Sequence, residues 1–199
     1  LGILCGGAPV PGLNDVLAAS VIYAVQLGWK VLGFHGGFNY LATSDLTTVL
    51  EHTVELTTDY VAPYTAKGGS FLTTDRFDPS KDDKYIDHVL QNLSQLHVRY
   101  LLVIGGNNKI MCVRNIAQKV DPSQLQVISI PKTIDNDIAI PKYVSTFGFH
   151  SARAFATKLV INLVEDCRSA PRWFVVELMG KQTGHLALSV ANAAGAHLC

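Results

Sequence analysis

Short apolar runs alternate with longer amphipathic stretches along the chain. The apolar runs have the length of buried strands and lie at residues 1–4, 30–34, 99–104, 126–130 and 173–179. Between several of them, apolar residues recur near a 3.6-residue period, which predicts helices over residues 14–27, 82–96, 110–119, 150–167 and 183–194. This alternation predicts a doubly wound, mostly parallel α/β sheet with helices on both faces. Residues 42–65 stay unassigned, and Asn14 is the expected N-cap of the first helix.

Four polar loops follow the ends of predicted strands. They read CGGAPVPGLN (5–14), GGNNK (105–109), PKTIDND (131–137) and GKQTG (180–184). In an open parallel sheet the carboxyl ends of the strands share one edge, and ligands bind in the crevice there. We therefore expect the four loops to converge on a single crevice.

Composition and charge narrow the class of protein. The 199 residues include 16 basic and 16 acidic side chains, so neither a nucleic-acid footprint nor a polybasic membrane patch is expected. No apolar run approaches the roughly 20 residues of a membrane helix. The 4 cysteines form no CxxC pair and the 7 histidines no HxxxH pair, which favours a reduced, cytoplasmic protein without a zinc site. Because the chain opens inside a predicted strand and lacks polar tails, we expect it to be part of a longer polypeptide.

The first two loops are rich in glycine. Glycine lets backbone N–H groups approach an anion, and the helix that follows adds the positive end of its dipole. In the second loop, Gly105 and Gly106 precede Lys109, whose ammonium could face a phosphate. Neither loop matches GxxxxGK[ST] or GxGxxG, so phosphate binding and an ordinary strand-to-helix turn both remain open.

The third loop carries the most distinctive chemistry. Asp135 and Asp137 cannot both face the same way on an extended loop without a cation or a proton between them. One acid could act as a general base while the other holds Mg²⁺. Lys132 would then supply a point charge to phosphate oxygens, and Thr133 a hydroxyl donor. The alternative is a turn whose acids are simply solvated.

Six motifs together resemble those of the phosphofructokinase family: PKTIDND, GGAPVPGLN, VIGGNNK, GGSFLTTDRF, STFGFHSA and VVELMGKQTGHLAL. The lysine of PKTIDND is similar to that of the pyrophosphate-using branch, since ATP-using bacterial members usually have glycine there. The motifs follow the order of the family along the whole chain. The resemblance implies the family's fold, with residues 1–199 as the N-terminal domain that carries the donor and catalytic loops, truncated before the rest of the sugar-phosphate domain.

The resemblance also implies roles for single residues. Asp135 matches the base that takes the proton from the sugar hydroxyl at carbon 1, and Asp137 matches an acid near the magnesium. Thr133 matches a donor to the transferred phosphoryl group, Lys132 the lysine of pyrophosphate users, and Arg76 an arginine that contacts the phosphoryl donor.

Further residues align with the donor loops and the sugar-phosphate site. The donor-loop positions are Gly7, Ala8, Gly106, Asn107, Asn108 and Lys109, with Asn107 also at a metal position. Met179, Gly180 and Lys181 match an element that lines the sugar-phosphate site. Arg172 matches an arginine that reaches fructose 6-phosphate in a neighbouring subunit, which implies a homo- or hetero-oligomer.

Three departures from the family pattern fall in three of the loops. Asn107 and Asn108 stand where an acid is usual, so we expect weaker binding of Mg²⁺. Ala8 replaces a glycine, and its methyl group could hinder a phosphate. Lys181 replaces an arginine and offers a point charge in place of a planar fork.

The expected activity is phosphoryl transfer from pyrophosphate, with ATP the less favoured donor, to fructose 6-phosphate in glycolysis. Mg²⁺ is the expected cofactor, and the isolated fragment should be inactive because most of the sugar pocket is missing. A non-catalytic regulatory domain that binds sugar phosphate and partners a catalytic subunit is the competing hypothesis. A nucleotide-binding oxidoreductase is disfavoured by the missing GxGxxG motif and ribose-binding acid.

Overall fold

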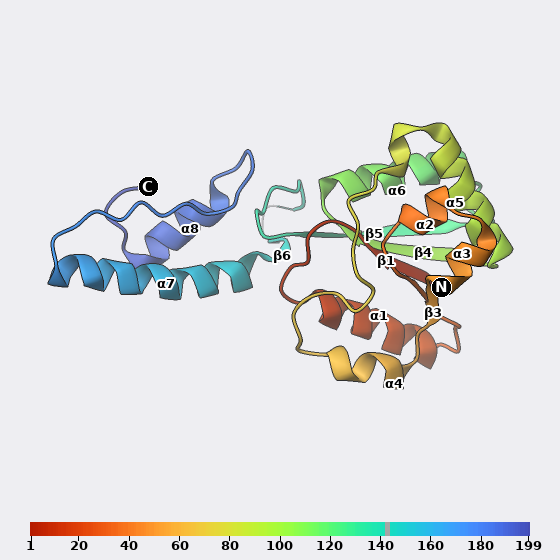
Figure 1. Ribbon diagram of the computed structural model, residues 1–199, viewed down its shortest axis with the longest axis horizontal. Coiled ribbons are helices and arrows are strands. Elements are labelled where there is room, and N and C mark those ends of the chain that lie inside the picture. Colours follow the sequence, from red (N-terminus) through yellow and green to blue (C-terminus); the bar gives the residue numbers. More distant parts are fainter. Residues whose placement is uncertain (142–143) are drawn as a thin grey trace. The chain divides into compact units, whose positions relative to one another are not determined.

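The computed structural model describes residues 1–141 and 144–199, and these divide into two compact units, Leu1–Pro131 and Lys132–Cys199 (Figure 1). Each unit has its own apolar core, and each is described here by itself.

A parallel sheet forms the centre of the first unit. Its parallel strands are β1 (Gly2–Cys5), β2 (Leu32–Phe34), β4 (Tyr100–Gly105) and β5 (Gln126–Thr133), in the order β2-β1-β4-β5. Strand β3 (Thr53–Glu55) pairs with β2 in the antiparallel sense and occupies the edge. The parallel α/β sheet predicted from the apolar runs is therefore confirmed.

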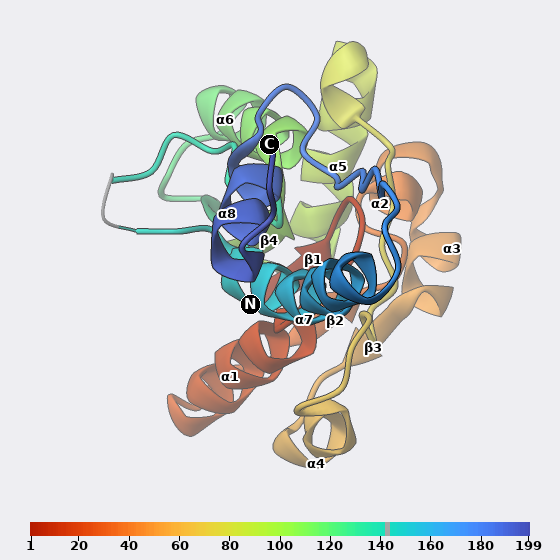
Figure 2. The same ribbon diagram turned by 90° about the vertical axis from the view of Figure 1, so that its left-hand side faces the viewer.

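Helices cover both faces of this sheet. On one side lie α1 (Leu13–Gln26) and α4 (Thr58–Val61); on the other lie α2 (Asn39–Thr43), α5 (Asp83–Gln95) and α6 (Asn107–Lys119), and the turned view of Figure 2 shows the same separation. The remaining short helices are α3 (Leu46–Glu51), η1 (Ala62–Tyr64) and η2 (Pro79–Lys81).

The largest core lies between the sheet and the helices α2, α5 and α6. Leu4 and Val103 contribute from the strands, Val89 and Leu93 from α5, and Ile116 from α6, all of them buried. Their spacing along α5 and α6 is the 3.6-residue period that predicted these helices. The face of each helix that carries this apolar spacing is therefore the face that packs on the sheet.

The second unit is built on two helices. Strand β6 (Phe147–Gly148) pairs with Lys132 and Thr133, the last residues of β5. Helices α7 (Phe149–Ser169) and α8 (His185–Ala194) pack against each other around a second core, formed by Phe149, Val160, Leu186, Val190 and Ala194. Across the described ranges, no helix is both long enough and apolar enough to span a membrane.

Two expectations about local structure were wrong. Residues 173–179 form no strand, and Trp173 and Val175 are 86% and 98% exposed. Apolar composition predicted a strand here, but a strand also needs a neighbour, and no described segment pairs with this one. Asn14 is not an N-cap either: Gly12, with φ +86°, takes that position, and the Asn14 amide instead donates to the carbonyls of Lys67 and Gly68.

The core between the sheet and α5 should depend on Leu4. Because Leu4 is fully buried, Leu4→Ala should lower the free energy of unfolding by about 2–5 kcal/mol, as measured by urea unfolding. Leu50→Ala is the matched control: that side chain is 52% exposed on α3, and the change should cost less than about 0.5 kcal/mol. Equal losses in the two variants would contradict this assignment of the core.

Candidate functional site

In the first unit, the loops after β1 and β4 lie side by side. Strands β1 and β4 are parallel neighbours, and just beyond them the Gly6 N–H donates to the carbonyl of Ile104 at 2.9 Å. The segment around Asp75 joins them, because the Gly7 N–H donates to the Asp75 carbonyl at 2.6 Å. The first and second predicted loops therefore converge, together with the segment that carries Arg76.

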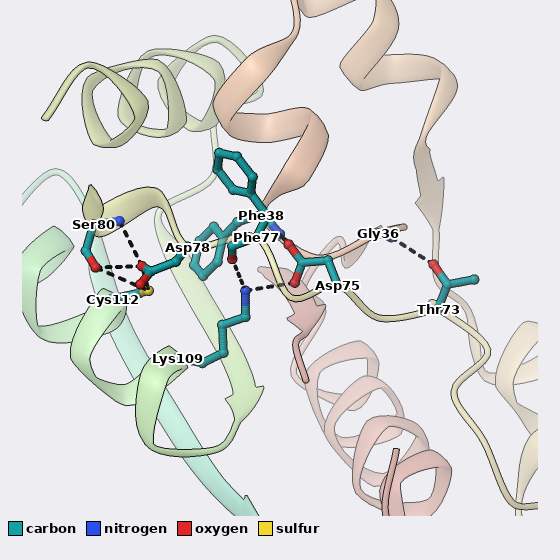
Figure 3. Close-up of polar contacts among 9 residues, drawn as sticks. All are labelled: Gly36, Phe38, Thr73, Asp75, Phe77, Asp78, Ser80, Lys109 and Cys112. Carbon is teal, nitrogen blue, oxygen red and sulfur yellow. Dashed lines mark hydrogen bonds and ion pairs between the residues drawn. The ribbon is translucent and has the colours of Figure 1, made fainter. Parts of the chain in front are cut away.

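A buried ion pair lies between these loops. The Lys109 ammonium is 2.8 Å from Asp75 Oδ1, with side-chain exposures of 5% and 8%, and it also donates to the carbonyl of Phe77 (Figure 3). A Cβ added at Gly6 or Gly105 would overlap the aliphatic stem of Lys109. The glycines of these loops were expected to let a phosphate approach the backbone; at Gly6 and Gly105 the space is filled by the lysine stem.

The surroundings of Asp75 have opposing effects on the pKa of its carboxyl group. Burial raises the pKa of the Asp75 carboxyl, and this outweighs the hydrogen bond and the charge of Lys109, which lower it. The second carboxyl oxygen accepts the Phe38 N–H at 3.2 Å. Removing Lys109 would therefore leave a buried carboxylate without its counter-ion, which is costly in a protein interior.

A second polar cluster holds the next turn of the chain. The Cys112 thiol donates to Asp78 Oδ1 at 2.9 Å, and the Ser80 N–H and hydroxyl donate to the same oxygen at 3.0 and 2.6 Å (Figure 3). Burial alone would raise the pKa of the Asp78 carboxyl, but these hydrogen bonds, with the charge of Lys109, bring it below its usual value. Burial first, and Asp78 second, raise the pKa of the Cys112 thiol to about 11.

The other predicted donor residues line the surface of these loops. Ala8, Arg76, Asn107 and Asn108 are exposed, and Gly106 is the N-cap of α6. Asn107 and Asn108 form the first turn of that helix. The predicted helix began only at residue 110, which placed both asparagines before it. In the structure the helix begins three residues earlier, at Asn107.

In the second unit, the third and fourth predicted loops come together at two carboxylates. Lys181 Nζ lies 3.8 Å from Asp135 Oδ2 and 3.7 Å from Asp137 Oδ2. The sequence required a cation or a proton between the two acids, and in the structure the cation is Lys181. The Asp135 side chain is 6% exposed and that of Lys181 65%, so the lysine reaches the buried acid from the solvent side.

Hydrogen bonds fix the turn that presents these acids. Thr133 Oγ1 accepts the Asp135 N–H at 3.0 Å, which leaves the hydroxyl hydrogen able to donate. The Thr146 hydroxyl donates to the Thr133 carbonyl at 2.7 Å, and the Thr183 hydroxyl donates to the Asp135 carbonyl at 3.2 Å. Sequence reasoning missed both threonines. Both lay within quoted motifs, Thr146 in STFGFHSA and Thr183 in GKQTG, but neither was given a role.

Lys132 and the predicted sugar-phosphate residues occupy different surroundings. Lys132 is buried at the end of β5, opposite Phe147. Met179, Gly180 and Lys181 border a hollow of about 460 Å³. Arg172 lies 3.5 Å from Asp166 and lines a larger cavity of about 910 Å³, whose walls are mostly apolar side chains of α7 and residues 171–178.

The carboxylates of the second unit suit a hard cation. Asp135 Oδ1 is buried and has no hydrogen-bond partner among the described residues, and carboxylate oxygen is a ligand that Mg²⁺ accepts. Across residues 1–141 and 144–199, no three His, Cys, Asp or Glu side chains gather into a metal site. A magnesium ion here would therefore depend on phosphate oxygens for part of its coordination.

Comparison with known proteins identifies the family. The family model described as Phosphofructokinase matches residues 1–199, so the chain belongs to the phosphofructokinase family. It is 38% identical over 196 residues to the pyrophosphate–fructose 6-phosphate 1-phosphotransferase of Thermotoga maritima, covering 98% of this chain and 46% of that protein. It is 40% identical over 198 residues to the protein of the same name from Naegleria fowleri, covering 100% of this chain and 44% of that protein. The chain thus spans less than half the length of these relatives.

Solved structures show the same fold. Phosphofructokinase from Saccharomyces cerevisiae matches with a TM-score of 0.80 and 22% identity, over 96% of this chain and 27% of the yeast chain. The pyrophosphate-dependent phosphofructokinase from Nitrosospira multiformis matches with a TM-score of 0.80 and 19% identity, over 96% and 49% of the two chains.

The raised pKa of Cys112 predicts slow alkylation. The folded protein keeps this thiol protonated until the pH nears 11, whereas an unfolded chain ionises it near the ordinary value of 9.0. Iodoacetamide at pH 9 should therefore modify Cys112 only after unfolding in urea, because the thiolate is the reacting species. The half-buried Cys167 is the internal reference, and peptide mass mapping measures both. Equal labelling of Cys112 in folded and unfolded protein would contradict the geometry.

Proposed function

We propose that this chain is the part of a phosphofructokinase that carries the phosphoryl-donor and catalytic loops, and that the full-length protein transfers a phosphoryl group from pyrophosphate to the 1-hydroxyl of fructose 6-phosphate. The observation that carries the proposal is Asp135, a buried acid with one unpartnered oxygen beside the exposed cation Lys181. The chain by itself should be inactive, since it spans less than half of the relatives it matches.

The second unit would supply the acid–base chemistry. Asp135 Oδ1 accepts the proton of the attacking sugar hydroxyl, and the Thr133 hydroxyl donates to the transferred phosphoryl group. Lys181, between the two acids, offsets charge that develops on the phosphoryl oxygens. Met179 and Gly180 would line the sugar phosphate, and Arg172 would reach the substrate of a neighbouring subunit in a homo- or hetero-oligomer.

The donor would be held by the loops of the first unit and by Lys132. Gly7, Ala8, Gly106, Asn108 and Arg76 are the candidate contacts. Lys132 and Asn108 favour pyrophosphate over ATP, because both would crowd the α-phosphate of a nucleotide. The two relatives described above are pyrophosphate enzymes, which supports this choice.

Magnesium would be held by Asp137, with Asn107 as the weaker candidate, and when bound it neutralises phosphate charge. A cytoplasmic location is supported by four free cysteines.

A regulatory role remains the second candidate. The amides of Asn107 and Asn108 and the buried Lys109–Asp75 pair lie in the loops proposed to hold the donor, whereas the loop of Asp135 keeps both of its acids. A domain that binds sugar phosphate without turnover would fit a chain that has amides in the donor loops and keeps the acids at 135 and 137.

Substitution of Asp135 tests the catalytic proposal. In the full-length protein, Asp135→Asn should lower kcat with pyrophosphate by about 10²–10⁴-fold and leave KM for both substrates nearly unchanged, because only proton transfer is lost. Asp121→Asn, at an exposed turn of the first unit, is the matched control and should leave kcat unchanged.

Three results would decide against the proposal. Turnover that survives Asp135→Asn removes this residue from catalysis. Activity with ATP alone overturns the choice of donor. Binding of fructose 6-phosphate by a wild-type protein without turnover favours the regulatory role.

Restoring an acid on the donor side tests the cause of any weak metal binding. Asn107→Asp should lower the magnesium concentration that gives half-maximal rate several-fold, because a carboxylate binds Mg²⁺ more strongly than an amide. Asn115→Asp, on the same helix, controls for the added charge. Magnesium titration of the initial rate measures both, and an equal response would show that the position of the acid is irrelevant.

A further inference from the structure

We propose that Lys109 is a positioning residue: the Lys109–Asp75 ion pair clamps the turn that carries Arg76, and Lys109 affects donor binding through Arg76 instead of touching the donor. The effect on the donor rests on the proposed function; the clamp itself does not. This assigns Lys109 a role different from the phosphate ligand that its sequence motif suggested.

The contacts of Lys109 fall on both neighbours of Arg76. Its ammonium is 2.8 Å from the Asp75 carboxylate and donates to the carbonyl of Phe77 (Figure 3). On the Asp75 side, the Gly7 and Phe38 N–H groups add hydrogen bonds of 2.6 and 3.2 Å. Arg76 itself is exposed. The backbone is thus held immediately before and after a side chain that extends into solvent.

The path of the Lys109 side chain argues against direct contact with a donor. Its stem runs over Gly6 and Gly105, where any added Cβ would overlap it, and the residue is 4% exposed. The backbone N–H groups of Gly6 and Gly7 are also committed, to the carbonyls of Ile104 and Asp75. A donor that approaches these loops therefore meets exposed Arg76 before it meets the buried ammonium.

Helix α6 holds the same turn at a second point. One helical turn beyond Lys109, the Cys112 thiol donates to Asp78 at 2.9 Å (Figure 3). The Phe77 ring packs edge-on against Tyr85 of α5, with centroids 5.1 Å apart. Both ends of the turn are consequently anchored to helices of the same core, which gives Arg76 a rigid base.

A thermal-unfolding cycle tests the clamp without any need for activity. In the full-length protein, Lys109→Met and Asp75→Asn should each lower the Tm, because each leaves one charge buried and unpaired. The double variant should recover most of the loss. Methionine keeps the stem over Gly6 and Gly105, and asparagine keeps an oxygen for the Phe38 N–H. Lys119→Met, in exposed ion pairs on the same helix, should leave the Tm unchanged. Additive losses in the double variant would overturn the clamp.

Tryptic cleavage reports on the turn itself. Trypsin cuts after exposed Arg76, and the rate of this cleavage depends on how often the surrounding turn opens. Lys109→Met should accelerate formation of the fragment that ends at Arg76, whereas Lys119→Met should not. An unchanged rate would show that Lys109 does not restrain this turn.

Pyrophosphate kinetics separate positioning from direct contact. Lys109→Met should raise KM for pyrophosphate about tenfold and leave KM for fructose 6-phosphate unchanged. In an Arg76→Ala background, Lys109→Met should add nothing further, because its effect passes through Arg76. A further tenfold rise there would make Lys109 a donor ligand and overturn the positioning role. If the wild-type protein shows no turnover with pyrophosphate, the proposed function fails, while unfolding and proteolysis still judge the clamp.

Discussion

The parallel pairing of β1 with β4 determines the arrangement of the first unit. Because the two strands run in the same direction and end together, the Gly6 N–H meets the Ile104 carbonyl as the chain leaves the sheet. The two loops are then so close that neither Gly6 nor Gly105 can carry a side chain without striking Lys109. The strand register therefore creates the space in which a lysine from α6 can cross to Asp75, and everything that Lys109 restrains follows from it.

Lys109 and Lys181 both meet acids in the predicted loops, and their burial separates their roles. Lys109 and Asp75 are both almost inaccessible, so their charges are already satisfied and a ligand would have to break the pair. Lys181 is largely exposed and lies near 4 Å from two acids, at distances too long for strong hydrogen bonds. Its ammonium is open to solvent, so it can meet an incoming phosphate while it stays beside the two acids. The same residue type is thus structural in one unit and available for chemistry in the other.

The sequence predicted features that depend on local periodicity and missed those that depend on distant partners. Helices α5 and α6 followed from apolar spacing, and the pairing of Asp135 and Asp137 around a cation followed from charge repulsion. The Lys109–Asp75 pair could not be found by spacing, because its members are separated by 34 residues and lie in two different motifs. Residues 173–179 show the converse error, since apolar composition cannot reveal whether a neighbouring strand exists.

The distribution of charge decides how the two candidate functions should be weighed. Amides at 107 and 108 and a lysine at 109 make the start of α6 less negative, but Asp75 neutralises that lysine inside the protein. The donor loops therefore gain little positive charge that a pyrophosphate could use, and the exposed charge left to them is that of Arg76. An enzyme with these loops would depend on Arg76 for the exposed positive charge that meets its donor, whereas a regulatory domain need not hold a donor at all. How firmly the turn beside Lys109 holds Arg76 therefore matters for an enzyme and does not matter for a regulatory domain that holds no donor.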